Sequence, residues 1–148
     1  NLTGILNTSN ILSQALSGSI ADTVHKGITK IRLQFLEPNG VALHPNDWEE
    51  IELTQDDVSR YYFGGPSILG TPRLWGLPVA QSREITENQG ICAEWPLAVL
   101  WDREQGSVSM SDSHSDFFTR NLVAVLAQLR AAFTVLRPAA FVLAELTA

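Results

Sequence analysis

The sequence predicts an α+β fold, because stretches with helical periodicity and stretches with strand periodicity are interleaved without a regular βαβ rhythm. In residues 22–36 the apolar positions follow the helical spacing of Val24, Ile28, Ile31 and Phe35. In residues 122–135 the odd positions are all apolar, as in a strand with one buried face. The chain has 148 residues, of which 45% are hydrophobic and 18% charged. Such a chain can bury a core of its own.

The first part of the chain predicts a loop, a helix, a short strand and a second helix. Residues 1–20 are rich in Ser, Asn and Gly and favour a loop with at most one short strand. Asp22 stands where an N-cap is expected for a helix that runs to about Leu36, before the turn at 37–40. Residues 41–45 indicate a buried strand, and Pro45 suits the first position of the next helix, whose Trp48 and Ile51 face the core.

The middle of the chain predicts short strands separated by glycine and proline. Residues 61–63 favour a strand that ends at Gly64-Gly65-Pro66, and residues 74–82 favour another, with Pro78 at an edge or a bulge. We interpret residues 64–66 and 75–78 as rigid corners, and we expect Trp75 to be buried with Trp48. Apolar segments flank Pro96, the first a strand and the second a short helix or a strand.

The last part of the chain predicts strands around one short helix. Residues 106–110 alternate as a half-buried strand does, and Ser113 with Asp116 resembles a capping box before a helix at 117–121. Residues 122–135 favour a strand by alternation, although their Ala, Leu, Gln and Arg content also suits a helix. The final strand covers residues 139–146, after Arg137-Pro138.

Composition excludes several functional classes. The formal net charge is −6 and there is no basic run, so sequence-specific nucleic acid binding is not expected. Cys92 is the only cysteine, which excludes an intrachain disulfide or a thiolate cluster and suits a reducing cytoplasm. No apolar run is long enough to cross a membrane and no signal peptide is visible, so no membrane partner is expected. Because the chain begins without methionine, we expect an excised domain.

Residue types and spacing predict no enzyme, no metal and no cofactor. The three histidines, His25, His44 and His114, are far apart, and His44 before Pro45 suits a cap better than a catalytic base. Residues 111–116, Ser-Asp-Ser-His-Ser-Asp, contain the residue types of a catalytic triad, but triads come from separate parts of a chain, so a solvated cap is favoured. Residues 64–70 lack the Gly-Lys-Ser/Thr of a phosphate-binding loop.

The order of segments over residues 40–145 resembles the C-terminal half of the tailed-bacteriophage major capsid protein family, whose fold is named after phage Hong Kong 97. The resemblance depends on motifs in the family's order and spacing, carried by Pro45, Asp47, Trp48, Arg60, Tyr61, Phe63, Gly64, Trp75, Gly76, Pro78, Asp102, Arg103, Arg137 and Pro138. Two departures stand out. Ser59 replaces the glycine before the Arg-Tyr step, and residues 81–98 are only loosely similar.

The resemblance implies an axial domain with part of the peripheral-domain sheet. Residues 1–106 would form the axial domain as a mixed sheet with flanking helices, 107–137 would supply peripheral-domain strands and a short helix, and 138–148 would return as a strand to the axial domain. It implies a structural shell subunit of a phage or prophage icosahedral capsid that encloses DNA in the virion and is assembled in the bacterial cytoplasm.

The resemblance also implies partners. The full-length protein would pack with copies of itself in pentamers and hexamers, and would work with scaffolding, portal and protease proteins. One alternative is an encapsulin-like shell of a bacterial nanocompartment, which has the same fold but encloses protein. A second alternative is an enzyme with an unrecognised site.

Some relatives in this family cross-link their shells through an isopeptide bond between a lysine and an asparagine. By resemblance the acceptor matches Asn121, and the position of the assisting glutamate holds Gln128. A neutral glutamine is a poor base for deprotonating a lysine. Seven residues of strand would also span about 23 Å, with the two side chains on opposite faces. We therefore expect no cross-link by this route and favour Asn121 as the cap of a helix at 117–120.

Overall fold

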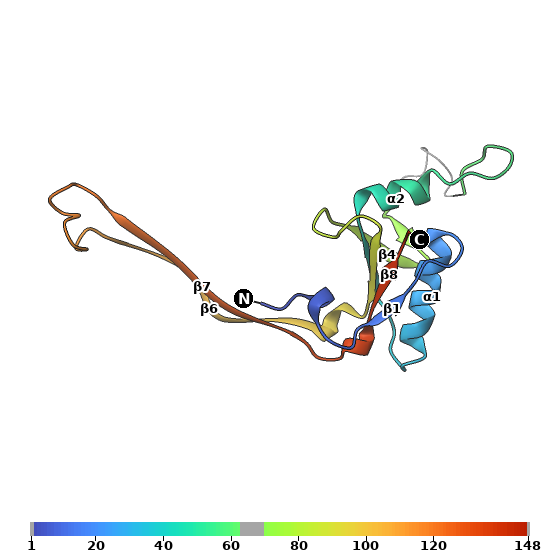
Figure 1. Ribbon diagram of the computed structural model, residues 1–148, viewed down its shortest axis with the longest axis horizontal. Coiled ribbons are helices and arrows are strands. Elements are labelled where there is room, and N and C mark those ends of the chain that lie inside the picture. The colour runs from blue at the N-terminus through green and yellow to red at the C-terminus, as the bar shows by residue number, and fades with distance from the viewer. Residues whose placement is uncertain (1, 63–69, 148) are drawn as a thin grey trace. The chain divides into compact units, whose positions relative to one another are not determined.

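The computed structural model describes residues 2–62 and 70–147, which divide into two compact units (Figure 1). The first, called here the sheet unit, comprises residues 4–98 and 135–147. The second, called here the ribbon unit, comprises residues 2–3 and 99–134. Helices, strands and 3-10 turns follow in the order η1 Ile5–Asn7, β1 Leu12–Gln14, α1 Ile20–Arg32, β2 Gly40–Leu43, α2 Pro45–Glu52, β3 Arg73–Leu74, β4 Leu77–Gln81, β5 Gln89–Ala93, η3 Trp95–Leu97, β6 Ala98–Ser111, β7 Ala124–Val135, η4 Pro138–Ala140 and β8 Phe141–Glu145.

The sheet unit is built on a six-stranded mixed sheet in the order β1-β8-β5-β2-β4-β3. The C-terminal strand β8 lies inside this sheet, parallel to β1 and antiparallel to β5. β2 lies between antiparallel β5 and parallel β4, and all four of its residues are buried. A strand that is buried along its whole length must be covered on both faces. The register therefore places apolar side chains in two separate layers.

One face of the sheet is covered by the two helices. Val24, Ile28 and Ile31 of α1, with Trp48 and Ile51 of α2, form a single core with strand residues that include Val41, Leu43, Cys92, Val142 and Ala144. The opposite face carries Ala42, Ile91, Ala93 and Phe141, packed against apolar residues of the N-terminal segment and of η3. At Gly27 the helix α1 approaches the sheet closely, because an added Cβ would lie 3.2 Å from Cγ1 of Val142.

α1 begins earlier and ends earlier than predicted. Its N-cap is Ser19, and Asp22 is the partner three residues later in a capping box. The Ser19 hydroxyl accepts a bond from Asp22 N at 3.1 Å, and the Asp22 carboxylate accepts one from Ser19 N at 3.2 Å. These bonds lower the pKa of Asp22. The helix ends at Arg32, and Phe35 is 96% exposed with φ of 59°, so its expected place on the buried stripe is wrong.

α2 confirms the prediction in detail. His44 is its N-cap, Pro45 takes the first helical position, and Trp48 and Ile51 are 5% and 2% exposed. Asp47 in the first turn is also buried, at 3% exposed. Both of its carboxylate oxygens accept from Asn88 N at 3.1 Å, so this side chain connects α2 to the start of β5. Burial raises the pKa of Asp47.

Two strand predictions in the middle of the chain need correction. Tyr61 forms only an isolated bridge with Gln55 instead of opening a strand, and residues 63–69 lie outside the described residues. The single strand expected at 74–82 is two strands, β3 and β4, joined by a turn at Trp75 and Gly76 with φ of 53° and 81°. Pro78 lies in β4 opposite Arg73 of β3, the two-residue strand at the edge of the sheet.

The ribbon unit consists of β6 and β7, which pair as a two-stranded sheet (Figure 1). The strand predicted at 122–135 is confirmed as β7, and the helical alternative is wrong. Its apolar face is not buried, however, since Val125 and Leu129 are 62% and 65% exposed. Residues 106–110 belong to β6 and are exposed, so the half-buried interpretation is wrong as well. Among the described residues no helix is both long and apolar enough to span a membrane.

Candidate functional site

The residues with catalytic potential have structural partners. His44 Nδ1 accepts from Asn46 N at 3.2 Å, which is the cap that the sequence favoured. The His25 ring lies against the Trp75 ring with centroids 4.5 Å apart, and the His114 ring lies against Phe117 at 5.3 Å. Within residues 2–62 and 70–147, no three His, Cys, Asp or Glu side chains are grouped so that they could hold a metal ion. In these contacts each histidine meets a backbone N–H or an aromatic ring, as a structural residue does.

A hollow in the sheet unit also lacks an acid–base pair. It lies between the N-terminal end of α1, the C-terminal half of α2 and the Trp75 ring, and the acidic residues that line it are Asp22 and Glu50. Asp22 is engaged in the capping box of α1. What remains is a concave surface with one free carboxylate, which is not the convergent set of groups that catalysis requires.

The ribbon unit exposes many large apolar side chains. Seven large apolar side chains on β6 and β7 are more than half exposed, on both faces of the ribbon: Leu100, Trp101, Val108, Met110, Val125, Leu126 and Leu129. A two-stranded sheet alone is marginally stable in water. Contiguous exposed apolar surface of this kind marks a place where other polypeptide packs. The ribbon is therefore the main candidate for an assembly surface.

One polar cluster connects the two strands of the ribbon. The Glu104 carboxylate of β6 accepts from Arg130 Nε at 3.1 Å and from Gln128 Nε2 at 3.2 Å, both on β7. Gln128 is the residue that the family resemblance places at the assisting-glutamate position. Its amide here donates to a carboxylate that an arginine already neutralises, so the cluster holds two strands together and offers no free base.

Asn121 ends a single helical turn. Residues 115–121 are a run of turns, so the predicted helix and its capping box at Ser113 are wrong; Ser113 instead bonds Ser111. One hydrogen bond with the i to i−4 spacing of an α-helix is present, from Arg120 N to Asp116 O. Asn121 has φ of 54°, Leu122 N donates to Phe117 O at 2.9 Å, and Asn121 N approaches Phe118 O at 3.4 Å. These features are typical of a Schellman C-cap, with asparagine in the left-handed position.

The signature residues of the resemblance have mostly structural positions. Asp47 and Trp48 anchor α2 to the core, and Arg137 Nη2 donates to Gln34 O beside η4, which begins at Pro138. Asp102 and Arg103 lie on exposed β6, and Phe63 and Gly64 lie outside the described residues. Trp75 was expected to be buried but is 52% exposed, although its indole Nε1 donates to Ala21 O at 2.8 Å.

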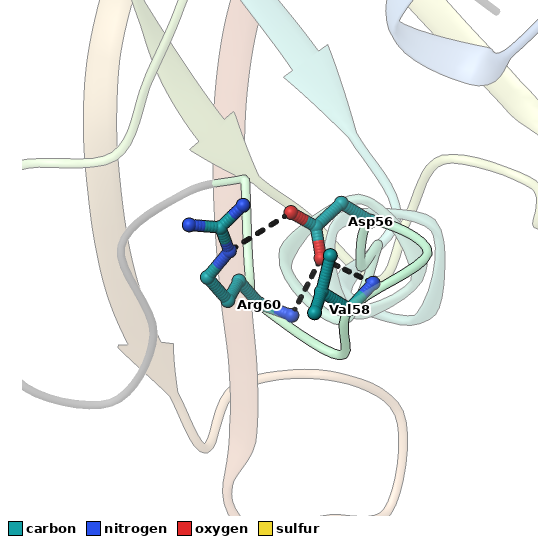
Figure 2. A network of polar contacts seen from close by, with 3 residues as sticks. All are labelled: Asp56, Val58 and Arg60. Carbon is teal, nitrogen blue, oxygen red and sulfur yellow. Dashed lines mark hydrogen bonds and ion pairs between the residues drawn. The ribbon is translucent and has the colours of Figure 1, made fainter.

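Asp56, to which the sequence analysis assigned no role, organises a whole loop. Figure 2 shows its carboxylate accepting from the backbone N–H groups of Val58 and Arg60, each at 2.9 Å, and from Arg60 Nε at 3.1 Å. The bond from the Arg60 backbone is the main reason that the pKa of Asp56 is lowered. Aspartate at the start of a turn commonly bonds the backbone two residues later, and that signal was present in the sequence.

Comparisons with known proteins bear on the whole chain. A model described as the phage capsid family matches residues 1–146. The major capsid protein of Enterobacteria phage HK97 is 30% identical over 123 residues, which cover 82% of this chain and 32% of that protein. The chain therefore spans about a third of this curated relative.

Solved structures show the same fold. The capsid of an empty GTA particle superposes with a TM-score of 0.77 at 16% identity, covering 100% of this chain and 57% of its own. A chain of Gordonia phage Cozz superposes with a TM-score of 0.71 at 21% identity, covering 95% of this chain and 51% of its own. The virus-like particle from Pyrococcus furiosus superposes with a TM-score of 0.63 at 15% identity, covering 95% of this chain and 58% of its own. In each case this chain accounts for little more than half of the structure it matches.

Proposed function

Because this chain belongs to the phage capsid family, we propose that it forms part of the structural shell subunit of a phage or prophage capsid and acts in the virion. The expected Hong Kong 97-like α+β fold is confirmed by the solved capsid chains that superpose on it. The family is one of structural proteins that assemble with themselves, which agrees with histidines that are occupied in a helix cap and in ring contacts.

The observation that carries the proposal is the ribbon unit. Its apolar side chains are exposed on both faces of two paired strands, and such a ribbon gains stability only when other polypeptide covers it. A shell subunit is expected to have this property, since its exposed apolar surfaces are covered by neighbouring copies or by further parts of its own chain. An enzyme or a monomeric binding domain has no comparable reason to expose such a ribbon.

The two units support an assignment to the two domains of a shell subunit. We assign the sheet unit to the axial domain, whose copies would meet around the five-fold and six-fold axes, and the ribbon unit to the peripheral domain. The closed core of the sheet unit suits a rigid wedge, and the uncovered ribbon suits a region that other segments overlay. Scaffolding, portal and protease proteins remain proposed partners on the family resemblance alone.

A nanocompartment shell is the competing function, because the Pyrococcus furiosus virus-like particle shares the fold. The 30% identity to a phage major capsid protein favours the phage assignment. The distinguishing experiment is production of the full-length protein with its neighbouring genes, followed by electron microscopy and analysis of the particle contents. Closed particles with nuclease-protected DNA are expected. Particles filled with protein would support the nanocompartment, and a lack of particles would contradict both.

A further inference from the structure

The loop between α2 and the undescribed segment at 63–69 is held in shape by its own bonds. This loop, called here the Asp56 loop, comprises residues 54–62. Tyr62 N donates to Thr54 O at 3.2 Å, Asp56 N donates to Arg60 O at 2.9 Å, and Gln55 bridges Tyr61 in antiparallel fashion. The Asp56 carboxylate fills the inside of the turn (Figure 2). The loop is thus a small closed hairpin, and it loses little conformational entropy when it binds a partner.

The same loop projects from the sheet unit beyond the end of α2 (Figure 1). Val58 at its tip is 70% exposed and Tyr62 is also 70% exposed. Ser59 holds a left-handed backbone with φ of 60°. A non-glycine residue in this region is strained, and strain of this kind is retained where the surrounding structure needs a particular shape. The hydrogen bonds of the loop hold its projecting tip in one shape, with the side chains of Asp57 and Val58 exposed.

The charges of the Asp56 loop are incomplete within one chain. Arg60 pairs with Asp56 only through Nε, its side chain is 77% exposed, and its two Nη amines contact no described residue. Asp57 is exposed beside it and has no hydrogen bond or ion pair to any described residue. A guanidinium binds carboxylates best through two amines. One loop therefore offers an unused donor pair and an unused carboxylate.

We propose that the Asp56 loop is a contact between copies of this chain, in which the Arg60 guanidinium of one copy binds the Asp57 carboxylate of the next. The inference rests on the proposed function as a self-assembling shell subunit. Donor and acceptor are different residues of one loop, so around the axis of a ring the same contact can repeat head-to-tail from copy to copy. A second copy is the occupant that fits, because the loop is complementary in charge to itself and a pre-shaped tip suits repeated docking around an axis.

The first test is proximity in assembled particles of the full-length protein. Variants Asp57→Cys and Arg60→Cys are produced separately, co-assembled and treated with a short bismaleimide, because an aspartate–arginine pair holds its Cβ atoms farther apart than a disulfide permits. Covalent dimers on a denaturing gel are expected from the mixture. The matched control replaces Asp57→Cys with Glu84→Cys, an exposed position on a different loop, and should give none. Cys92 is buried and adds no background.

Intact particles without dimers from the mixture would overturn the inference, and so would coupling of Arg60→Cys to a different protein. Because wild-type particles form in either case, this failure differs from failure of the proposed function, in which no particles form. If the cysteine variants do not assemble, the Asp57→Asn variant is tested instead. Its control is Glu52→Gln, which removes the same charge elsewhere in the chain. Asp57→Asn should raise the concentration needed for assembly by up to about five-fold per contact, with the difference vanishing in high salt. Equal assembly concentrations for the two variants would contradict the contact.

Discussion

Ser59 departs from the family motif, yet its backbone adopts a conformation that favours the glycine of that motif. The family pattern has glycine before the Arg-Tyr step, and Ser59 adopts φ of 60°, the left-handed region that glycine enters without strain. Its N–H still bonds Asp56 O at 3.0 Å, so the turn survives the substitution. The departure from the family's glycine therefore falls at a left-handed position, where a serine is strained and a glycine would not be.

Ser59→Gly should stabilise the chain modestly. Relief of the left-handed strain is worth about 1–2 kcal/mol, and the extra freedom of glycine in the unfolded chain costs about 0.4–1 kcal/mol. A net gain of roughly 0.5–1 kcal/mol in the free energy of unfolding is expected from urea denaturation. Ser59→Ala, which keeps a Cβ, is the control and should show no gain. A loss of stability in Ser59→Gly would mean that the serine side chain contributes more than its strain costs.

Cys92 should couple stability to alkaline pH. Burial raises the pKa of its thiol from 9.0 to about 12. Between these values the unfolded chain releases the proton and the folded chain keeps it, so stability is complete below about pH 9 and falls as the pH rises toward 12. The loss should be on the order of 1 kcal/mol at pH 10 relative to Cys92→Ala, which cannot titrate. Urea denaturation of both proteins across this range measures it, and parallel curves would contradict the burial of the thiol.

At the scale of elements, the two tryptophans of the signature motifs have different roles. Trp48 is 5% exposed and fixes α2 to the core, whereas Trp75 is 52% exposed and contacts α1 through the bond to Ala21 O and the His25 ring. Trp75 also occupies a turn with positive φ. A tryptophan in a motif therefore does not by itself indicate a core residue.

Trp48→Ala should lower the free energy of unfolding by about 3–5 kcal/mol, the usual range for removing a large aromatic side chain from a core. Trp75→Ala is the matched comparison and should cost clearly less, because half of its surface is already in water. Denaturant midpoints of the two variants give the answer. A loss below about 1 kcal/mol for Trp48→Ala would place α2 outside the core.

At the scale of the whole molecule, the chain on its own should be monomeric or weakly associated. A rigid sheet unit and an uncovered ribbon are parts of an assembly surface, and contacts between sheet units alone should be small. Analytical ultracentrifugation at micromolar concentration is the measurement. A stable closed pentamer or hexamer of this chain would contradict the expectation and would show that the sheet units associate strongly without further segments.

The full-length shell should not be cross-linked through Asn121. The asparagine caps a turn, and Gln128 donates its amide to Glu104, which Arg130 already pairs. A lysine that attacks an amide must first lose its proton, and no free base stands at this position. Denaturing gel electrophoresis of mature particles should show single chains. A ladder of covalent oligomers that disappears in Asn121→Asp would refute the prediction.

Periodicity and motif order are local properties of the chain, and they predicted most of the helices and strands as well as the family, although they missed the turn that divides β3 from β4 and wrongly predicted a helix at 117–121. The sequence placed α2 to the residue through Pro45 and found β7 by alternation. Tertiary structure alone decided which apolar faces are covered. Val24 and Val125 both stand on regular apolar stripes, yet one is 0% and the other 62% exposed. Periodicity shows that a face is apolar, whereas its cover comes from elements distant in sequence or from other polypeptide, which no local pattern encodes.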